Sequence, residues 1–381
     1  MDLARITREF QDNFASLGEL GASVSIWQAG REIVNLGAGF CDRERTEPWT
    51  ADTSVLVWSA TKGPAAGCLL RACQEHGIAL STPASALWPE FAAGGKAEIT
   101  IGQIMSHQAG LAGLSQDVPV LDYAAVIAAL EVQTPLWPPG SGHGYHPRTI
   151  GYLFDELVRR ITGGTTLRDY WRRVFAEPLG LDLWIGLDVT NVSPISPIYA
   201  PRSAPQKGDP FYAAFLTAGS PTSRAFASPK GFHTAGSMNA PEARAASLPA
   251  FGGIGTARAL AKYYAMLAHG GALDGRFFFT PETLALMSTV RTQGADRVLL
   301  SETAFSAGFM KDPVGPDGRK LRRLFGPSLL AFGQPGAGGS HAFADPENGV
   351  SFAYVMNQME PGVLPGEKSL RLVRAMTDAF E

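Results

Sequence analysis

The sequence predicts an α+β fold in which strands from both ends of the chain form one antiparallel sheet. Strand-like patterns occur near the start and again in the last third of the 381 residues, and helical patterns dominate the middle. A further helical pattern lies at each end of the chain. Strands and helices segregated in this way are typical of an antiparallel sheet covered by helices. We therefore expect terminal helices packed on the sheet and a mainly helical lobe inserted between its two halves.

The first element is an amphipathic helix over residues 1–17, where apolar residues recur every three or four positions. Residues 22–29 and 32–40 alternate apolar and polar residues on either side of Gly30, which predicts a β-hairpin. The pattern then becomes mainly helical as far as about residue 190. The helices expected there cover 64–76, 100–107, 121–131, 148–161 and 166–176.

Residues 190–250 are rich in Pro, Ser, Ala and Gly and show little periodicity. Because a plain loop of this length is unusual in a compact domain, the segment either covers a site or links two lobes. Helices are expected after it over 256–269, 281–287 and 367–380. Strand-like patterns cover 303–310, 324–332, 338–344 and 350–357.

These elements divide the chain into two lobes. Residues 1–75 and 250–381 are expected to form an α/β lobe that contains the sheet, and residues 76–249 a mainly helical lobe. Ligand sites are common at such boundaries, so we expect the active site between the lobes.

The composition restricts the class of protein. With 45% hydrophobic residues, 18% charged residues and a formal net charge of −3, it is that of a soluble globular protein. Nucleic-acid binding needs clustered Lys and Arg, so no such partner is expected. We find no signal-peptide core and no apolar run of membrane-spanning length, so we expect a cytoplasmic protein without a membrane partner. The three cysteines make neither a disulfide framework nor a zinc pattern, and we expect no metal and no cofactor.

One short stretch carries the first chemical signal. An apolar run over 55–57 leads to Ser59, and Lys62 follows three residues later. Positions i and i+3 share one face of a helix, which would bring the lysine within reach of the serine hydroxyl. A serine attacks only when a neighbouring group takes its proton, and a lysine in a dry pocket can do so because its pKa is lowered. The alternative is a capping serine beside a solvated lysine, since about one Ser-x-x-Lys is expected by chance.

Two loop-like stretches offer partners for this serine. Tyr145 lies among small residues within the Pro- and Gly-rich stretch 137–147. A nearby lysine ammonium would favour its phenolate, which could accept a serine proton; the alternative is a tyrosine that only packs its ring. Residues 332–341 are dense in glycine, which indicates close backbone approach. A backbone N–H there would complete an oxyanion hole with that of Ser59, or the stretch is a β-bulge.

Together these stretches resemble the serine β-lactamase and penicillin-recognising superfamily. Ser59-Ala60-Thr61-Lys62-Gly63, Tyr145 and Gln334-Pro335-Gly336 occur in the order of that group. The stretch Met105-Ser106-His107-Gln108-Ala109-Gly110-Leu111 is similar to its Leu-Ser-His-Thr-Ser-Gly-Leu. The resemblance is closest to class C β-lactamase-like proteins and family VIII carboxylesterases and covers about residues 10–375. It implies a β-lactamase/transpeptidase-like fold.

The resemblance also implies roles for individual residues. Ser59 would be the nucleophile, Lys62 its partner, and Tyr145 the general base or proton shuttle. The backbone N–H groups of Ser59 and Ala337 would hold the oxyanion. The residues expected to contact substrate are Trp58, His146, Gln334 and Gly336.

The sequence departs from the β-lactamase pattern in two places. Gln334 and Pro335 stand where β-lactamases and peptidases of the group have Lys-Thr, so no cation is present to pair with a substrate carboxylate. Pro147 stands where the class C enzymes have an Asn. We therefore expect weak recognition of anionic β-lactams and better tolerance of neutral esters.

The sequence thus predicts a serine carboxylesterase that acts on a small-molecule ester through an acyl-enzyme on Ser59. Acyl transfer to an alcohol or amine, or weak β-lactam or peptide hydrolysis, remains open because all these reactions share the acyl-enzyme. A binding protein without catalysis is the third possibility, since fold does not fix function. The sequence leaves the oligomeric state open.

Overall fold

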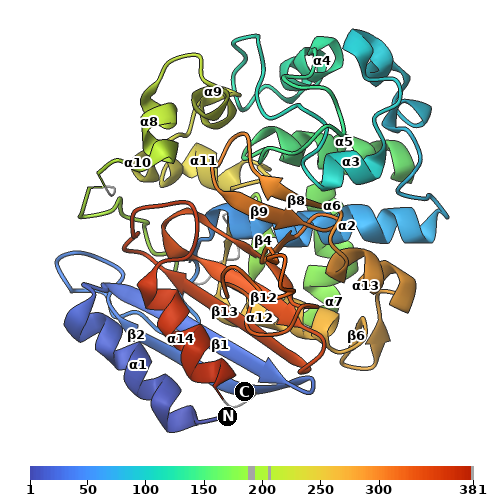
Figure 1. Cartoon of the computed structure of the whole chain (residues 1–381). Helices are drawn as coiled ribbons and strands as arrows, with labels where there is room; N and C mark the ends of the chain where they lie inside the picture. Colours follow the sequence, from blue (N-terminus) through green and yellow to red (C-terminus); the bar gives the residue numbers. More distant parts are fainter. Residues whose placement is uncertain (188–193, 205–206, 379–381) are drawn as a thin grey trace.

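The central feature of the fold is an eight-stranded antiparallel sheet to which both ends of the chain contribute (Figure 1). The computed structural model describes residues 1–187, 194–204 and 207–378. Along the sheet the strands follow the order β2-β1-β13-β12-β11-β10-β9-β8. In that order their bounds are Arg31–Gly39, Gly21–Gln28, Val350–Met356, His341–Asp345, Phe332–Pro335, Met310–Lys311, Glu302–Phe305 and Thr292–Ala295. The predicted α+β class, with a sheet built from both chain ends, is confirmed.

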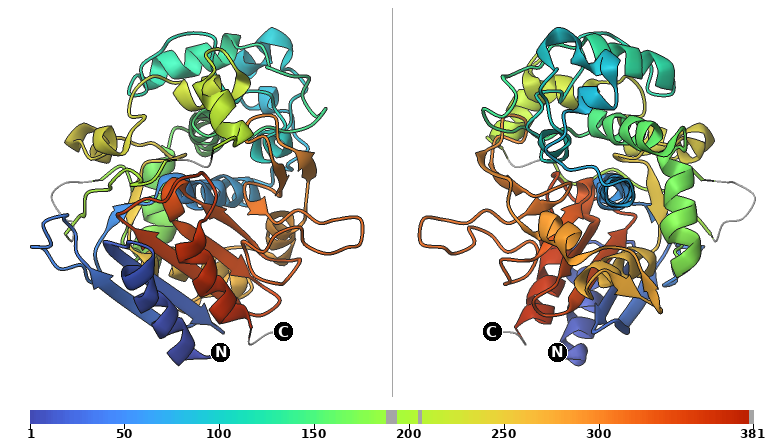
Figure 2. Two further views of the ribbon diagram at one scale, coloured as in Figure 1. Left: turned by 60° about the vertical axis from the view of Figure 1, so that its left-hand side comes forward. Right: turned by 90° about the vertical axis from the view of Figure 1, so that its right-hand side faces the viewer.

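Helices cover both faces of this sheet (Figures 1 and 2). On one face α1 (Leu3–Ser16) lies beside α14 (Glu367–Thr377), and the Asn13 side chain donates to the Lys368 carbonyl oxygen at 2.9 Å. The other face is covered by α12 (Ala257–Ala268). Because both faces are covered, every residue of β13 is buried. The closing helix was predicted to reach residue 380, and residues 379–381 lie outside the described part of the chain.

The middle of the chain forms a group of helices around α2 (Lys62–Glu75), which is buried along most of its length. Two small residues on α2 allow neighbours to approach closely. A Cβ added at Gly63 would lie 2.1 Å from the Tyr264 hydroxyl oxygen, and one at Gly67 would lie 2.0 Å from that of Tyr263. The other helices here are α3 (Ile101–Met105), α4 (Tyr123–Val132), α5 (Thr149–Thr162), α6 (Leu167–Trp171) and α7 (Glu177–Leu179), with a π-helical turn over Arg172–Ala176 and 3-10 turns over Ala84–Ala86 and Pro89–Gly95.

Smaller elements connect the two groups. A three-stranded sheet in the order β3-β5-β4 lies next to α2, and a two-stranded hairpin follows α12. The bounds of these elements are β3 Val55–Leu56, β4 Leu183–Ile185, β5 Gly253–Gly255, β6 Ala272–Leu273, β7 Arg276–Phe277 and α13 Pro281–Ser288.

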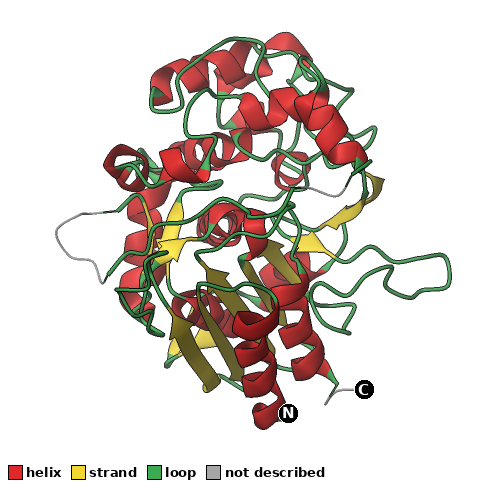
Figure 3. Ribbon diagram, turned by 90° about the vertical axis from the view of Figure 1, so that its left-hand side faces the viewer, coloured by secondary structure: helices red, strands yellow, loops and turns green. Residues whose placement is uncertain are grey.

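Among its described residues, the segment predicted to lack periodicity over 190–250 contains four short helices, which are labelled in Figure 1 and drawn in red with the other helices in Figure 3. They are α8 (Pro210–Leu216), α9 (Pro221–Ala227), α10 (Ala235–Met238) and α11 (Pro241–Ala245). Three of them begin at a proline, which is well suited to a first helical turn. Helices of four to seven residues complete at most two turns, so they leave no readable helical period. Residues 190–193 and 205–206 of this segment are outside the described residues.

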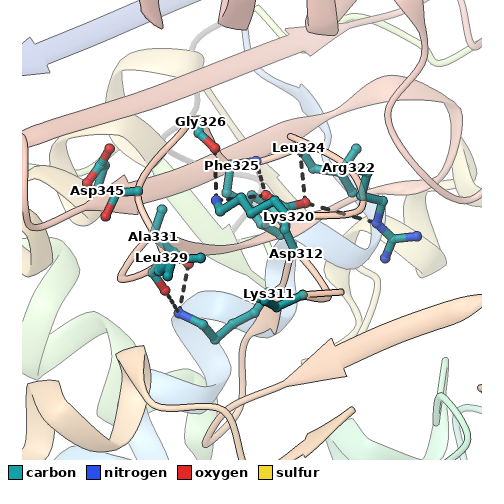
Figure 4. A network of polar contacts seen from close by, with 12 residues as sticks. Lys311, Asp312, Lys320, Arg322, Leu324, Phe325, Gly326, Leu329, Ala331 and Asp345 are labelled. Atoms are coloured by element: carbon teal, nitrogen blue, oxygen red, sulfur yellow. Dashed lines mark hydrogen bonds and ion pairs between the residues drawn. The ribbon is translucent and has the colours of Figure 1, made fainter. Parts of the chain in front are cut away.

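The predicted strand over 324–332 is wrong except for its last residue, where β11 begins. Residues 312–331 form a long loop whose ends are fastened by buried polar contacts (Figure 4). The Asp312 carboxylate accepts from Lys320 Nζ at 3.0 Å and from the backbone N–H groups of Leu324 and Phe325 at 2.9 and 3.1 Å. Apolar residues at 324–325 are therefore buried by this anchor rather than by strand pairing. The strand predicted over 303–310 is likewise two short strands, β9 and β10, separated by a turn.

Candidate active site

Ser59 lies in a 3-10 turn, Trp58–Thr61, between β3 and α2. Trp58 has a φ of +48°, a conformation that costs energy for a residue with a side chain and that commonly marks functional sites. A clamp holds this turn in place: the Thr61 hydroxyl donates to the Trp58 carbonyl oxygen and accepts from the Gly253 N–H at 2.8 Å. The backbone that presents Ser59 is therefore fastened to β5.

Lys62 points back at Ser59 from the first turn of α2. Only 1% of its surface is exposed, and its Nζ lies 3.0 Å from Ser59 Oγ, 2.8 Å from the Pro147 carbonyl oxygen and 2.7 Å from that of Ala250. No carboxylate within the described residues forms an ion pair with it. Burial lowers the pKa of Lys62 well below its ordinary value, and the nearby Arg148 charge lowers it further.

This set of partners suits a neutral amine. A neutral lysine has two N–H donors and one lone pair, and the two carbonyl oxygens occupy both donors. The lone pair is then left for the hydroxyl proton of Ser59. The site therefore presents a basic nitrogen at 3.0 Å from the serine oxygen.

Tyr145 lies on the other side of this pair. It is 4% exposed, its hydroxyl oxygen accepts from Gln334 Nε2 at 3.1 Å, and Lys62 Nζ lies 4.9 Å from the centre of its ring. Burial raises the pKa of Tyr145, and the hydrogen bonds with Ser59 and Gln334 offset this only in part. The expectation that an ammonium would favour the phenolate is thus not met, because Lys62 is itself shifted towards its neutral form. The structure brings Ser59, Lys62 and Tyr145 together with a neutral phenol.

Ser59 faces a cavity of 540 Å³ that is mostly apolar. Trp58 and Ala337 line it as well, so two of the predicted contact and oxyanion residues share the cavity with the serine. Helices α8 and α9 supply much of the wall. The segment over 190–250, which was expected either to cover a site or to link two lobes, therefore covers this cavity. The aromatic lining residues are Trp58, Phe211, Tyr212, Phe215, Phe226 and Phe251.

Three residues predicted to contact substrate do not line this cavity. Gln334 is buried and directs its amide to Tyr145 and to the Pro335 carbonyl oxygen. Gly336 instead allows the backbone to approach, since a Cβ there would lie 2.2 Å from the Val57 carbonyl oxygen. This contact holds the 337–339 turn against the segment that carries Ser59.

His146 was expected to contact substrate, but it does not line the cavity. Its Nε2 accepts from the Leu111 N–H at 2.9 Å, and Nδ1 lies 2.7 Å from the Gly144 carbonyl oxygen. The ring is fully buried, and burial lowers its pKa to about 4, so it is a neutral group whose two nitrogens are both used. His146 supports the loop before and after Tyr145 rather than facing the cavity.

The structure also identifies site residues that the sequence did not. Thr61 clamps the serine turn, and the carbonyl groups of Pro147 and Ala250 orient Lys62. A backbone carbonyl has no residue signature, so no pattern could have indicated the latter two. Among the described residues no three His, Cys, Asp or Glu side chains gather as metal ligands would. No helix of the described chain is long and apolar enough to span a membrane.

Residues 4–375 match the β-lactamase family. The chain belongs to this family. Its members are serine hydrolases. The family resemblance predicted from the three stretches is confirmed.

Relatives of the family include enzymes named for ester hydrolysis. The chain is 31% identical to the esterase/β-lactamase LipL of Mycobacterium tuberculosis, over 93% of this chain and 81% of that protein. A crystal structure of a family VIII carboxylesterase is 31% identical, with a TM-score of 0.87 over 98% of this chain and 96% of that one. A penicillin-binding protein homologue from Caulobacter crescentus is 38% identical, with a TM-score of 0.87 over 99% and 97%.

Proposed function

We propose that this protein is a serine carboxylesterase that hydrolyses neutral esters through an acyl-enzyme on Ser59. The observation that carries the proposal is the buried lysine whose nitrogen lies 3.0 Å from the serine oxygen and has no carboxylate partner in the described chain. A neutral amine in this position is a general base poised for the serine proton. The esterase names of the relatives point in the same direction.

In the acylation step, Ser59 Oγ attacks the ester carbonyl carbon while Lys62 Nζ takes the hydroxyl proton. The oxyanion that forms is held by the backbone N–H groups of Ser59 and Ala337. The carbon–oxygen bond to the alcohol then breaks. The proton passes from Lys62 to the leaving oxygen by way of the Tyr145 hydroxyl, which lies beside Ser59.

Deacylation repeats these transfers with water. A water oxygen attacks the acyl carbonyl, its proton goes to the same Lys62–Tyr145 pair, and the bond to Ser59 Oγ breaks. Ser59 recovers a proton and the carboxylic acid leaves. Because the amine and the phenol are both neutral at rest, each proton taken at one step is available for the next.

The proposed substrate class follows from the cavity. A volume of 540 Å³ with aromatic walls fits a small ester with apolar acyl or alcohol groups. Gln334 stands at the position where β-lactamases hold a carboxylate with a lysine. Its side chain carries no charge, and its amide donates to the Tyr145 hydroxyl oxygen. A neutral ester therefore fits this side of the site better than an anionic β-lactam does.

The proposal is tested with Ser59→Ala and a chromogenic short-chain ester. We expect turnover to fall to the background rate and labelling by a fluorophosphonate probe to disappear. Ser141→Ala is the matched control, because Ser141 lies in an exposed Gly-Ser-Gly sequence and should leave both signals intact. Unchanged turnover in Ser59→Ala would refute the proposal.

Acyl transfer or weak β-lactam hydrolysis is the second candidate, favoured by the esterase/β-lactamase name of the Mycobacterium relative. The fraction of product that forms with an added alcohol instead of water measures the first activity. Fast turnover of a chromogenic cephalosporin would show the second and would contradict the argument from Gln334. Failure of the probe to label folded protein at Ser59 would instead favour a binding protein without catalysis.

A further inference from the structure

A buried carboxylate lies behind the loop that carries Tyr145. Asp296 follows β8 and is 2% exposed. The Tyr145 N–H is shared between its two oxygens, Oδ1 at 3.1 Å and Oδ2 at 3.2 Å. Oδ1 also accepts from the N–H groups of Val298 and Leu299, each at 2.8 Å. The backbone of the active-site tyrosine is therefore joined directly to this carboxylate.

A second connection runs to the same loop through side chains. The Thr303 hydroxyl donates to Asp296 Oδ2 at 3.1 Å, and its oxygen lies 2.7 Å from His143 Nε2. Since the hydroxyl proton is used on Asp296, His143 donates to Thr303 from Nε2. His143 Nδ1 then accepts from the Thr292 hydroxyl at 2.9 Å. The carboxylate thus fixes the loop both at residue 143 and at residue 145.

No lysine or arginine forms an ion pair with Asp296 in the described part of the chain. Its partners are three backbone N–H groups and one hydroxyl, all of them donors, which suits an ionised carboxylate. The carboxylate lies within hydrogen-bond distance of the Tyr145 backbone. Burial is the main cause that raises the pKa of Tyr145, and the Asp296 charge raises it further, whereas the hydrogen bonds with Ser59 and Gln334 lower it.

The other groups around Tyr145 do not supply this effect. Lys62 lies over the ring and is shifted towards its neutral form, and Gln334 carries no charge. His107 packs against the ring at 4.9 Å between centroids, and burial lowers its pKa well below the ordinary value. Burial also lowers the pKa of His143, on the far side of Asp296. Among these groups, Asp296 is the one whose charge acts on the pKa of Tyr145.

We propose that Asp296 is a positioning residue for Tyr145, which holds the backbone of the tyrosine so that its hydroxyl stays beside Ser59. The inference rests on the proposed esterase function, because it assigns Tyr145 a proton-transfer step. A phenol displaced by a fraction of an ångström would no longer meet Ser59 and the leaving oxygen together. The role is exerted through Tyr145, since Asp296 does not line the cavity.

The test is Asp296→Asn, which keeps the size of the side chain and removes its charge and part of its acceptor capacity. With the chromogenic ester we expect kcat to fall at least tenfold while KM stays within twofold. Asp312→Asn is the matched control: this carboxylate is equally buried and also accepts from two backbone N–H groups, but it anchors the 312–331 loop. The control should lower the melting temperature and leave kcat unchanged.

Thr303→Val provides a second variant in case Asp296→Asn does not fold. It removes only the hydroxyl that joins Asp296 to His143, and we expect a severalfold loss of kcat without a change in KM. A kcat within twofold of the wild type in both variants would overturn the inference, as would an equal loss of kcat in Asp312→Asn. Wild-type protein that neither turns over the ester nor reacts with the fluorophosphonate would overturn the proposed function itself. An active wild type with insensitive variants overturns the inference about Asp296 alone.

Discussion

Replacing Lys62 by Met tests the central feature of the site, a buried lysine whose pKa folding lowers. Met has a similar length and no titratable group. The substitution removes the base next to Ser59, and loss of general-base catalysis lowers rates by about 10²- to 10⁴-fold. It also leaves the carbonyl groups of Pro147 and Ala250 without the N–H donors that they have in the wild type. We expect a folded protein with kcat reduced by that factor.

The magnitude of the effect on stability follows from proton linkage. In the unfolded chain Lys62 holds its proton up to a pH near 10.5, whereas in the folded chain its pKa lies well below that value. Between these two pKa values the unfolded state binds one more proton than the folded state. The free energy of unfolding therefore rises with pH in this window, by about 1.4 kcal/mol per pH unit for one proton. Below the native pKa of Lys62 this dependence ends, because both states are then protonated.

The assay is urea denaturation of wild type and Lys62→Met at several pH values from 7 to 9.5. The wild type minus variant difference in unfolding free energy should rise over this range, by about 2.7 kcal/mol across two pH units if the native pKa lies below the range. Lys311→Met is the control. Burial lowers the pKa of Lys311 to about 8, so the wild type minus Lys311→Met difference in unfolding free energy should rise only above that pH. A Lys62→Met difference that is flat from pH 7 to 9.5 would refute the idea of a neutral lysine.

Two further predictions concern residues next to Ser59, Lys62 and Tyr145. Thr61→Val removes the hydroxyl that joins the Trp58 carbonyl to the Gly253 N–H; we expect a loss of about 1–3 kcal/mol in urea denaturation and slower fluorophosphonate labelling of Ser59. Gln334→Lys places an ammonium next to the Tyr145 hydroxyl, so we expect the ratio of cephalosporin to neutral-ester hydrolysis to increase. An unchanged ratio would show that the residue at 334 does not select between these substrates.

Much of the fold could be predicted because its signals are local or periodic. The hairpin of β1 and β2 has clear alternation around Gly30, and α1 and α5 have apolar residues at helical spacing. The nucleophile stretch was recognisable because the i, i+3 relation between Ser59 and Lys62 is set by helix geometry alone. Tyr145 was a candidate from its loop context, and the family resemblance favoured a catalytic role over simple packing, since a tyrosine in a glycine-rich loop has no distinctive pattern of its own.

The features that escaped prediction depend on contacts between distant segments. The apolar residues at 324–325 resemble a strand, but a buried carboxylate 12 positions earlier holds them in a loop. His146 stands next to the active-site tyrosine in sequence, yet both of its ring nitrogens bond to the backbone of other residues. Asp296 is separated from Tyr145 by 151 positions, and nothing in the spacing of acidic residues indicates that the two would meet.

The partners of Lys62 explain why its chemistry depends on the complete fold. A single carboxylate would have been enough to bury the lysine, but it would have stabilised the ammonium and removed the base. Instead the amine meets oxygens from three separate parts of the chain, at residues 59, 147 and 250. None of these oxygens carries a charge, so they orient the nitrogen while favouring the ammonium less than a carboxylate would. Burying an amine without a counter-charge costs free energy, and the packing of α2 between the sheet and the helices offsets this cost. The proposed reactivity of Ser59 therefore depends on the assembled structure rather than on the Ser-x-x-Lys sequence alone.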